Sequence, residues 1–186
     1  MGSLRALAGD LGIPERTLRR AASEGLVRGS RTSPRRFETT VRERWYLHNY
    51  WPLLRELRDA LRTEPNVRLG VLFGSTATGR AHAASDIDIV VSLADSSMGR
   101  IADLSSRLAA RLGRDVQLVR LEDARQAPQL MRALTTQGRV LVDRDGEWPA
   151  IVEEAPRWLV RAHRAEKRDA LAAYTAAFTE QASRRS

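Results

Sequence analysis

The sequence contains no cysteine, which excludes disulfide bonds and thiolate metal sites. No apolar run approaches the roughly 20 residues of a membrane-spanning helix, and the first residues lead into a helical pattern instead of a signal peptide. We therefore expect a soluble, cytoplasmic protein with no membrane contact. Lysine is almost absent too: Lys167 is the only one, although the 186 residues carry a formal charge of +8. Nearly all of the positive charge is guanidinium, which suits phosphate recognition.

The densest chemical pattern is the stretch from Val71 to Val91, VLFGSTATGRAHAASDIDIVV. It opens with a short apolar run that predicts a buried strand ending at Gly74 and Ser75. A second apolar run begins around Asp86 and Asp88. Because successive side chains on a strand point to opposite faces, the two carboxylates share one face.

This combination predicts a site for a triphosphate and a metal ion. Magnesium is commonly held by one or two carboxylates together with substrate phosphates. A glycine lets the backbone approach a ligand closely, and residues Thr76 to Gly79 are expected to open a helix whose amides face a phosphate. Either half alone would suit a turn or a solvated, acidic strand start equally well.

The stretch GSTATGRAHAASDIDIVV resembles the signature of the DNA-polymerase-β-like nucleotidyltransferases, in particular the minimal members found in HEPN/MNT toxin–antitoxin pairs. The resemblance extends more weakly to about Asp145. It implies that Asp86 and Asp88 are catalytic and hold Mg²⁺, with an NTP as substrate. The nucleotide-binding residues that it implies are Gly74, Ser75, Arg80 and Ser85.

The resemblance also implies a third acid on a later strand, but the aligned residue in this chain is Gln117. An amide can orient a ligand, yet it cannot accept a proton or add negative charge to a metal site. Asp115 lies two positions earlier and therefore on the same face of the strand. It is a candidate substitute, and it would equally suit an exposed residue at the start of a strand.

The N-terminal segment follows the pattern of a helix-turn-helix. A helix from Ser3 to Leu11 is broken by Gly12, a second helix is expected from Glu15 to Glu24, and residues 27–37 suggest a hairpin or wing. The segment resembles the winged, MerR-like variety, in which the second helix enters the major groove. The residues expected to contact DNA are Arg16, Thr17, Arg19, Arg20, Arg31, Arg35 and Arg36. A small helical bundle with a solvated basic face is the alternative.

The expected fold class is α/β (α+β): a small mixed β-sheet flanked by helices, preceded by the helix-turn-helix. We expect a DNA-binding unit over residues 1–38, a connecting helix over 39–64, a nucleotidyltransferase core over 65–146 and a helical region over 147–186. The connecting helix should be kinked or divided at Pro52. The residues expected on its apolar side are Val41, Trp45, Leu47, His48, Leu54, Leu57 and Leu61. Ile151, Trp158, Leu159, Ala162, Leu171, Tyr174 and Phe178 are expected to be buried in the last region.

Two functional hypotheses follow. The first is a magnesium-dependent nucleotidyltransferase that transfers NMP from an NTP to a hydroxyl, coupled to a DNA-binding unit and of the antitoxin type. The second, motivated by Gln117, is a DNA-binding transcriptional regulator with a catalytically degenerate nucleotidyltransferase domain. The expected partners are an NTP, double-stranded DNA and a protein acceptor or cognate toxin, with a homodimer if the operator is two-fold.

Overall fold

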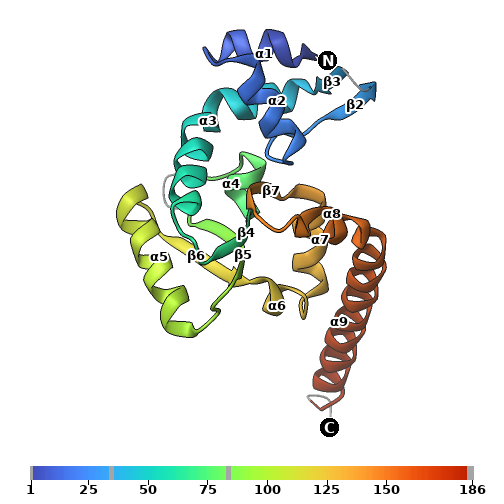
Figure 1. Cartoon of the computed structure of the whole chain (residues 1–186). Helices are drawn as coiled ribbons and strands as arrows, with labels where there is room; N and C mark the ends of the chain where they lie inside the picture. The colour runs from blue at the N-terminus through green and yellow to red at the C-terminus, as the bar shows by residue number, and fades with distance from the viewer. Residues whose placement is uncertain (1, 34–35, 83–84, 184–186) are drawn as a thin grey trace.

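The computed structural model describes residues 2–33, 36–82 and 85–183. Its centre is a four-stranded mixed sheet with the strand order β6-β5-β4-β7 (Figure 1). β4 (Val67–Phe73) pairs antiparallel with β5 (Ile87–Leu93) and β7 (Arg139–Asp143), whereas β5 and β6 (Val116–Arg120) are parallel. The predicted small mixed sheet is confirmed, and β6 and β7 are its edge strands.

The N-terminal unit consists of two short helices and a small sheet. α1 (Leu4–Asp10) and α2 (Glu15–Ser23) precede an antiparallel hairpin made by β2 (Ser30–Ser33) and β3 (Arg36–Thr39). β1 (Gly2–Ser3) pairs with the other edge of β3. The two helices therefore lie where the sequence predicted them, whereas the hairpin strands begin and end two to three residues later than the predicted range 27–37.

α3 (Val41–Arg62) connects the N-terminal unit to the sheet as one helix. The predicted division at Pro52 does not occur. Proline has no N–H to donate to the carbonyl four residues earlier, but Pro52 lies on the exposed side of the helix, where water can bind that carbonyl instead. The expected apolar side is also wrong at its start: Trp45 is 54% exposed, and Val41 is exposed too. Leu47, Leu54, Leu57 and Leu61 are buried as predicted, whereas His48 is exposed. Trp45 and Leu47 could not both be buried, since residues two positions apart point to nearly opposite sides of a helix.

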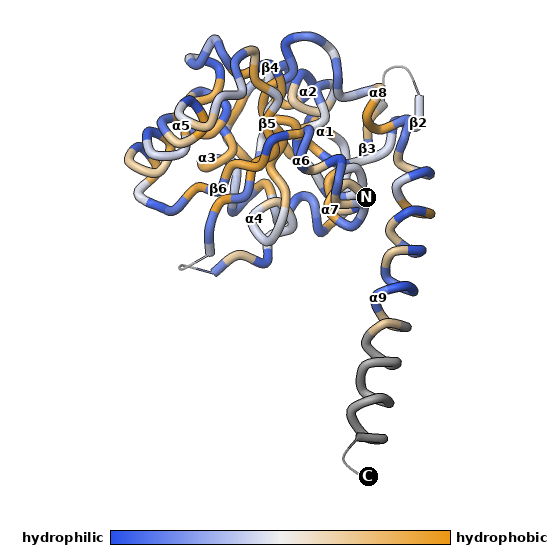
Figure 2. Tube along the Cα trace, turned by 90° about the horizontal axis from the view of Figure 1, so that it is seen from below, coloured by the Kyte–Doolittle hydropathy of each residue, from blue (hydrophilic) through white to orange (hydrophobic). Residues whose placement is uncertain are grey.

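Helices cover both faces of the central sheet, which gives a three-layered arrangement. One face packs against α3, α5 (Met98–Leu112) and the N-terminal unit. The other face packs against α6 (Leu121–Ala124), α7 (Pro128–Gln137), α8 (Glu147–Glu153) and the start of α9 (Ala155–Ser183). Figure 2 shows the apolar residues concentrated in β4, β5 and the helix turns next to them.

α9 packs on α7 near its start and then extends away from the body of the molecule (Figures 1 and 2). Ile151, Trp158 and Ala162 are buried as predicted, but Leu159 is half-exposed. The side chains of Leu171, Tyr174 and Phe178 lie outside the described residues. Within the described part of the chain, no helix is both long and apolar enough to cross a bilayer.

A single cluster of buried side chains runs from the N-terminal unit through α3 into the sheet. Leu7 and Leu18 belong to it together with Leu57 and Leu72. The N-terminal unit therefore shares its hydrophobic core with the sheet. The division into segments 1–38, 39–64, 65–146 and 147–186 stays a prediction, which domain-wise unfolding experiments would test.

Candidate functional site

The chain bends sharply at Gly74, where β4 ends and the short helix α4 (Gly74–Thr78) begins. Gly74 has φ +72°, a left-handed conformation that side chains rarely adopt. A Cβ atom there would also collide with the carboxylate of Asp88, which occupies the space beside the bend. Phe73 is the cross-strand partner of Asp88. The structure thus brings one predicted acid directly against the predicted glycine.

Asp88 lies near the start of β5 and faces away from Ile87 and Ile89, which pack on the α3 and α5 side of the sheet. Asp86 directly precedes β5 and lines cavities beside α5. Asp86 is exposed and Asp88 is half-buried. Burial raises the pKa of Asp88, and the negative charge of Asp86 raises this pKa further. The two carboxylates therefore repel each other, and a cation between them would relieve this repulsion.

The register of the parallel pair β5–β6 places Gln117 directly beside Asp88. Asp115 precedes this pair, and its carbonyl accepts a hydrogen bond from Ile87 N at 2.9 Å. Asp86 and Asp115 together line two adjoining cavities of about 440 and 430 Å³. Gln117 lines the second of these. β6 and the residue before it therefore present one acid, Asp115, and one amide, Gln117, beside Asp86 and Asp88.

The remaining predicted nucleotide-binding residues surround the bend. The carbonyl of Ser75 accepts a hydrogen bond from Arg80 N at 2.9 Å. Arg80 is exposed, and its Nε donates to Thr78 Oγ1 at 3.2 Å. Ser85 Oγ accepts a hydrogen bond from His82 N at 3.0 Å. The first two thus stabilise the α4 turn, and Ser85 orders the chain just before Asp86.

α4 differs from the prediction in where the helix begins and ends. Gly79 was expected within the opening turn of a helix, but it ends α4 with φ +73°. A Cβ atom on Gly79 would come within 3.0 Å of Trp45 and 3.1 Å of Tyr46. The aromatic residues of α3 therefore pack on this glycine, which explains why Gly is required where α4 turns back.

Arg114 is a residue near the site that sequence reasoning missed. Its guanidinium donates to the carbonyl of Ser85, and Arg114 lines the cavity shared by Asp86 and Asp115. The only signal in the sequence was one more arginine in an arginine-rich chain. Its proximity to the acids follows from the packing of the α5–β6 turn on the loop before β5.

A second missed residue is Arg139, whose guanidinium is fully buried behind α4. It donates to Ala77 O at 2.8 Å and Leu26 O at 3.1 Å, and it forms a bidentate ion pair with the carboxylate of Glu43. Its guanidinium also stacks on the ring of Tyr46, 3.5 Å from the centroid. An arginine in an otherwise apolar strand was the available signal. This residue joins the N-terminal unit, α3 and α4.

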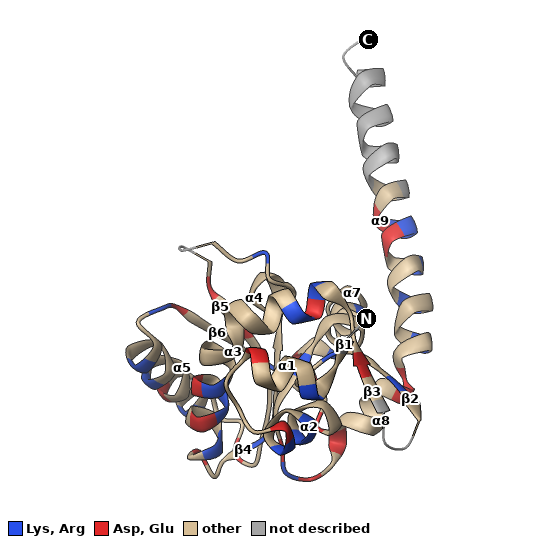
Figure 3. Cartoon of the chain, turned by 90° about the horizontal axis from the view of Figure 1, so that it is seen from above, with Lys and Arg blue, Asp and Glu red and all other residues tan. Residues whose placement is uncertain are grey.

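The predicted DNA-contact residues lie away from the acids, on α2 and the hairpin. Arg16, Thr17, Arg19, Arg20 and Arg31 are exposed. Arg19 pairs with Glu15, and Arg20 pairs with Glu24 at 2.7 Å. Arg35 and the side chain of Arg36 lie outside the described residues. Figure 3, in which the ribbon is coloured by residue type, shows both basic and acidic positions along α2 and α5.

The donor set suits a magnesium ion that is shared with phosphate. Within residues 2–33, 36–82 and 85–183, no three His, Cys, Asp or Glu side chains form a group that could hold a metal alone. Magnesium does not need such a cage, because one or two carboxylates plus substrate phosphates and water commonly hold it. Asp86 and Asp88 supply these carboxylates beside the Gly74 bend.

Comparisons with known proteins agree with this geometry. Residues 55–147 match the family described as polymerase beta, nucleotidyltransferase. The protein adenylyltransferase MntA of Shewanella oneidensis is 40% identical over 91 residues, which are 48% of this chain and 61% of the relative. This chain thus spans less than two thirds of that relative. All predicted nucleotide-site residues lie inside the matched region, and the two N-terminal helices lie outside it.

Two solved structures have the same core. A crystal structure of a toxin–antitoxin with AMP-PNP has a TM-score of 0.53 at 28% identity, covering 66% of this chain and 98% of that chain. A mutant of the toxin–antitoxin MntA–HpeT has a TM-score of 0.53 at 27% identity with the same coverage.

Proposed function

Because the chain belongs to the polymerase beta nucleotidyltransferase family, we propose that it transfers a nucleoside monophosphate from an NTP to a hydroxyl acceptor. The observation that carries this proposal is the carboxylate of Asp88 packed against the Gly74 bend, with Asp86 beside it. A polyphosphate that approaches the bend would meet both acids. ATP is the proposed donor, since the relative MntA is called an adenylyltransferase and a similar structure contains AMP-PNP.

Each residue has a proposed role. Asp86 and Asp88 would hold Mg²⁺, which when bound neutralises phosphate charge and lowers the pKa of a hydroxyl. Gly74 makes the sharp bend against which Asp88 packs, and Ser75 offers its hydroxyl to the phosphates. Arg80 would add positive charge, and Ser85 holds the loop that leads to Asp86. Catalysis would then rest mainly on positioning and charge stabilisation.

Gln117 decides how much chemistry this site can perform. It lies beside Asp88, where the resemblance expects a third acid, so no carboxylate stands there to accept the proton of the attacking hydroxyl. Asp115 is the proposed substitute, because it lines the same cavities as Asp86. The Asp115→Asn substitution removes this charge. It should then lower turnover strongly and reduce the affinity for the nucleotide less.

The proposed acceptor is a protein hydroxyl on a cognate toxin. This rests on the solved structures, which are toxin–antitoxin assemblies, and on the name of the relative MntA. In this proposal the chain acts as the antitoxin and modifies its partner. A reading frame for a HEPN-type toxin next to the gene would support the assignment.

Label transfer is the direct test of the proposed activity. The full chain is incubated with labelled ATP, magnesium and the candidate toxin, alongside the Asp86→Asn/Asp88→Asn double variant. We expect transfer by the wild type and none by the double variant. Gln117→Asp should raise turnover if this position is the lost acid, and Gln117→Asn serves as its matched control. Transfer that persists in the double variant would contradict the proposal.

A second proposed function is DNA binding by the N-terminal unit, as part of a regulator. It is supported by α2, which exposes Arg16, Thr17 and Arg19 ahead of the β2–β3 hairpin. DNA affinity should fall with rising salt, and the Arg16→Ala/Arg19→Ala variant should bind more weakly with a smaller salt slope. Arg107→Ala on α5 is the control. Equal DNA affinity of the wild type, the Arg16→Ala/Arg19→Ala variant and the Arg107→Ala variant would contradict this proposal.

A further inference from the structure

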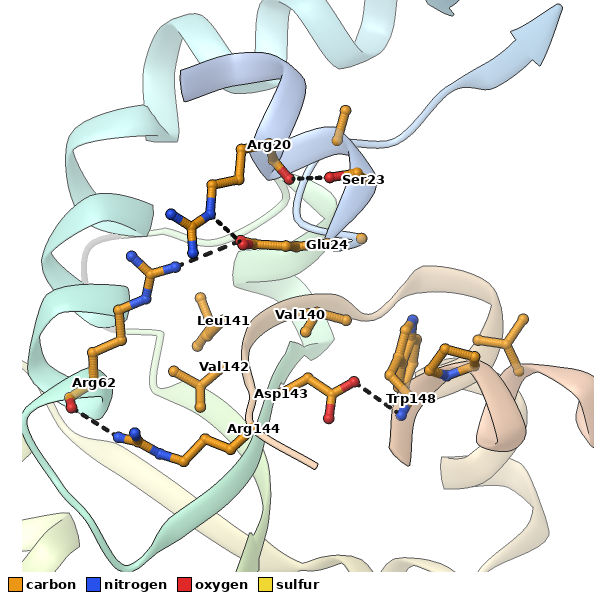
Figure 4. Close-up of a pocket in the computed structure, with 14 residues that line it drawn as sticks. Arg20, Ser23, Glu24, Arg62, Val140, Leu141, Val142, Asp143, Arg144 and Trp148 are labelled. Atoms are coloured by element: carbon orange, nitrogen blue, oxygen red, sulfur yellow. Dashed lines mark hydrogen bonds and ion pairs between the residues drawn. The ribbon is translucent and has the colours of Figure 1, made fainter. Parts of the chain in front are cut away.

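A cavity of about 940 Å³ lies between α2, β7 and α8, apart from the site described above (Figure 4). None of the predicted nucleotide-site residues lines it. Small-molecule sites typically enclose roughly 300–1,000 Å³, lie preferentially where structural units meet, and combine apolar walls with a few convergent polar groups. This cavity lies where the N-terminal unit meets the edge of the central sheet, so its position and size both match a ligand site.

One wall of the cavity carries an excess of positive charge. Glu24 pairs with Arg20 at 2.7 Å, with Arg62 at 3.5 Å and with Arg58. Figure 4 shows the first two side chains converging on Glu24 at the same wall. Three guanidinium groups thus share one carboxylate, and the Nε of Arg58 is buried without a hydrogen-bond partner. Burial and the charge of Arg62 lower the pKa of Arg58.

The other charged groups of the lining are already engaged. Asp143 accepts hydrogen bonds from Glu147 N at 3.0 Å and Trp148 N at 3.2 Å, so it stabilises the start of α8. Arg144 donates to the backbone carbonyls of Val67 and Arg62, both at 2.8 Å. These two residues therefore shape the cavity, and the charge excess remains at the Glu24 wall.

The facing wall is apolar and contains one aromatic ring. Val140, Val142, Pro149 and Val152 line it together with Trp148. Gly25 leaves the space that the ring occupies, since a Cβ atom there would come within 3.3 Å of Trp148 Nε1. A ligand that spans the cavity would meet guanidinium groups at one end and a flat indole at the other.

We propose that this cavity binds a small organic anion carrying a flat ring, with the anionic group between Arg20 and Arg62 and the ring against Trp148. A nucleoside monophosphate has this chemistry and is the chosen probe. The anion would take over guanidinium hydrogen bonds that Glu24 now shares among three arginines. The ring would replace water against the valines and the indole.

Calorimetric titration with AMP tests the proposal on the full chain. The titration is done in EDTA with a protein that carries Asp86→Asn and Asp88→Asn, so that AMP cannot bind through a metal ion at the proposed nucleotide site. This double variant is the background for all further substitutions. We expect saturable binding that quenches tryptophan fluorescence, with no quenching in Trp148→Phe. Arg62→Gln should bind at least about tenfold more weakly, because it loses a charge-assisted hydrogen bond. Arg100→Gln is the matched control, because Arg100 is an exposed residue of α5 that does not line the cavity. This variant should bind AMP with the same affinity as the protein in which it is made.

Two further arms locate the ligand. Inorganic phosphate should bind more weakly than AMP, because it lacks the ring. Val152→Trp should abolish binding by filling the cavity from its rim, and Val152 is 39% exposed, so the variant is expected to fold. Thermal unfolding checks that each variant is folded. Absence of AMP binding, equal affinity in Arg62→Gln and its background, or binding that needs magnesium and the two aspartates would overturn the proposal.

Discussion

Replacing Glu43 by alanine is expected to destabilise the protein more than removal of any exposed charge. Glu43 and Arg139 are 5% and 1% exposed, and their two contacts measure 2.6 and 2.8 Å. Glu43 Oε1 also accepts a hydrogen bond from Arg28 N at 2.9 Å. Burial, followed by the charge of Arg139, lowers the pKa of Arg28 to about 10, so this region is already crowded with positive charge.

The size of the effect follows from the charge that is left behind. Glu43→Ala leaves the buried guanidinium of Arg139 without a carboxylate, and breaking a buried pair in this way costs about 3–5 kcal/mol. For a chain of this length, 1 kcal/mol shifts the melting temperature by about 2–4 °C. We therefore expect the melting temperature to fall by about 6–20 °C.

Thermal and urea unfolding, followed by circular dichroism, measure the change. Asp145→Ala is the control, because it breaks an exposed ion pair with Arg68, and exposed pairs contribute little. The double variant Glu43→Leu/Arg139→Met should be more stable than Glu43→Ala, since neither charge remains buried alone. A Glu43→Ala protein that unfolds within about 1 kcal/mol of the wild type would refute this reasoning.

Three other changes have defined outcomes. Asp88→Asn should raise the melting temperature in EDTA at pH 7, because folding raises the pKa of Asp88 and the charged carboxylate therefore destabilises the folded state. This gain should shrink as the pH falls toward 3.8, the ordinary pKa of the carboxyl group, where it is protonated in the folded state. Gly74→Ala should abolish label transfer and lower stability, whereas Gly99→Ala, with nothing within 4 Å, should not. Trp51→Ala should cost about 3–5 kcal/mol in urea unfolding and Trp45→Ala far less, because Trp51 is buried and Trp45 exposed.

The strands and the acid pair could be predicted from the sequence because their signals are local. An apolar run marks each buried strand, and the two-residue period places Asp88 on the face opposite Ile87 and Ile89 whatever surrounds them. Gly113 ends α5 in the left-handed conformation, which glycine adopts readily at the end of a helix. The bend at Gly74 was recognisable for the same reason.

The side of α3 that is buried could not be predicted in the same way. Aromatic residues occupy several faces of this helix, so the local pattern allowed Trp45 as well as Tyr46 to point inward. The choice was made by the N-terminal unit and the sheet, which cover the side of Tyr46 and leave Trp45 exposed beside Gly79.

The sequence alone determined the elements of the site: a strand, a glycine bend and two acids at a fixed spacing, since each depends on neighbours a few residues away. Only the tertiary structure decided that Gln117 lies beside Asp88, that Arg139 joins Glu43 across 96 positions, and that arginines from α2 and α3 face Trp148 across a cavity. These contacts connect segments far apart in the chain, and their geometry follows from how the helices pack on the sheet, which no local pattern encodes.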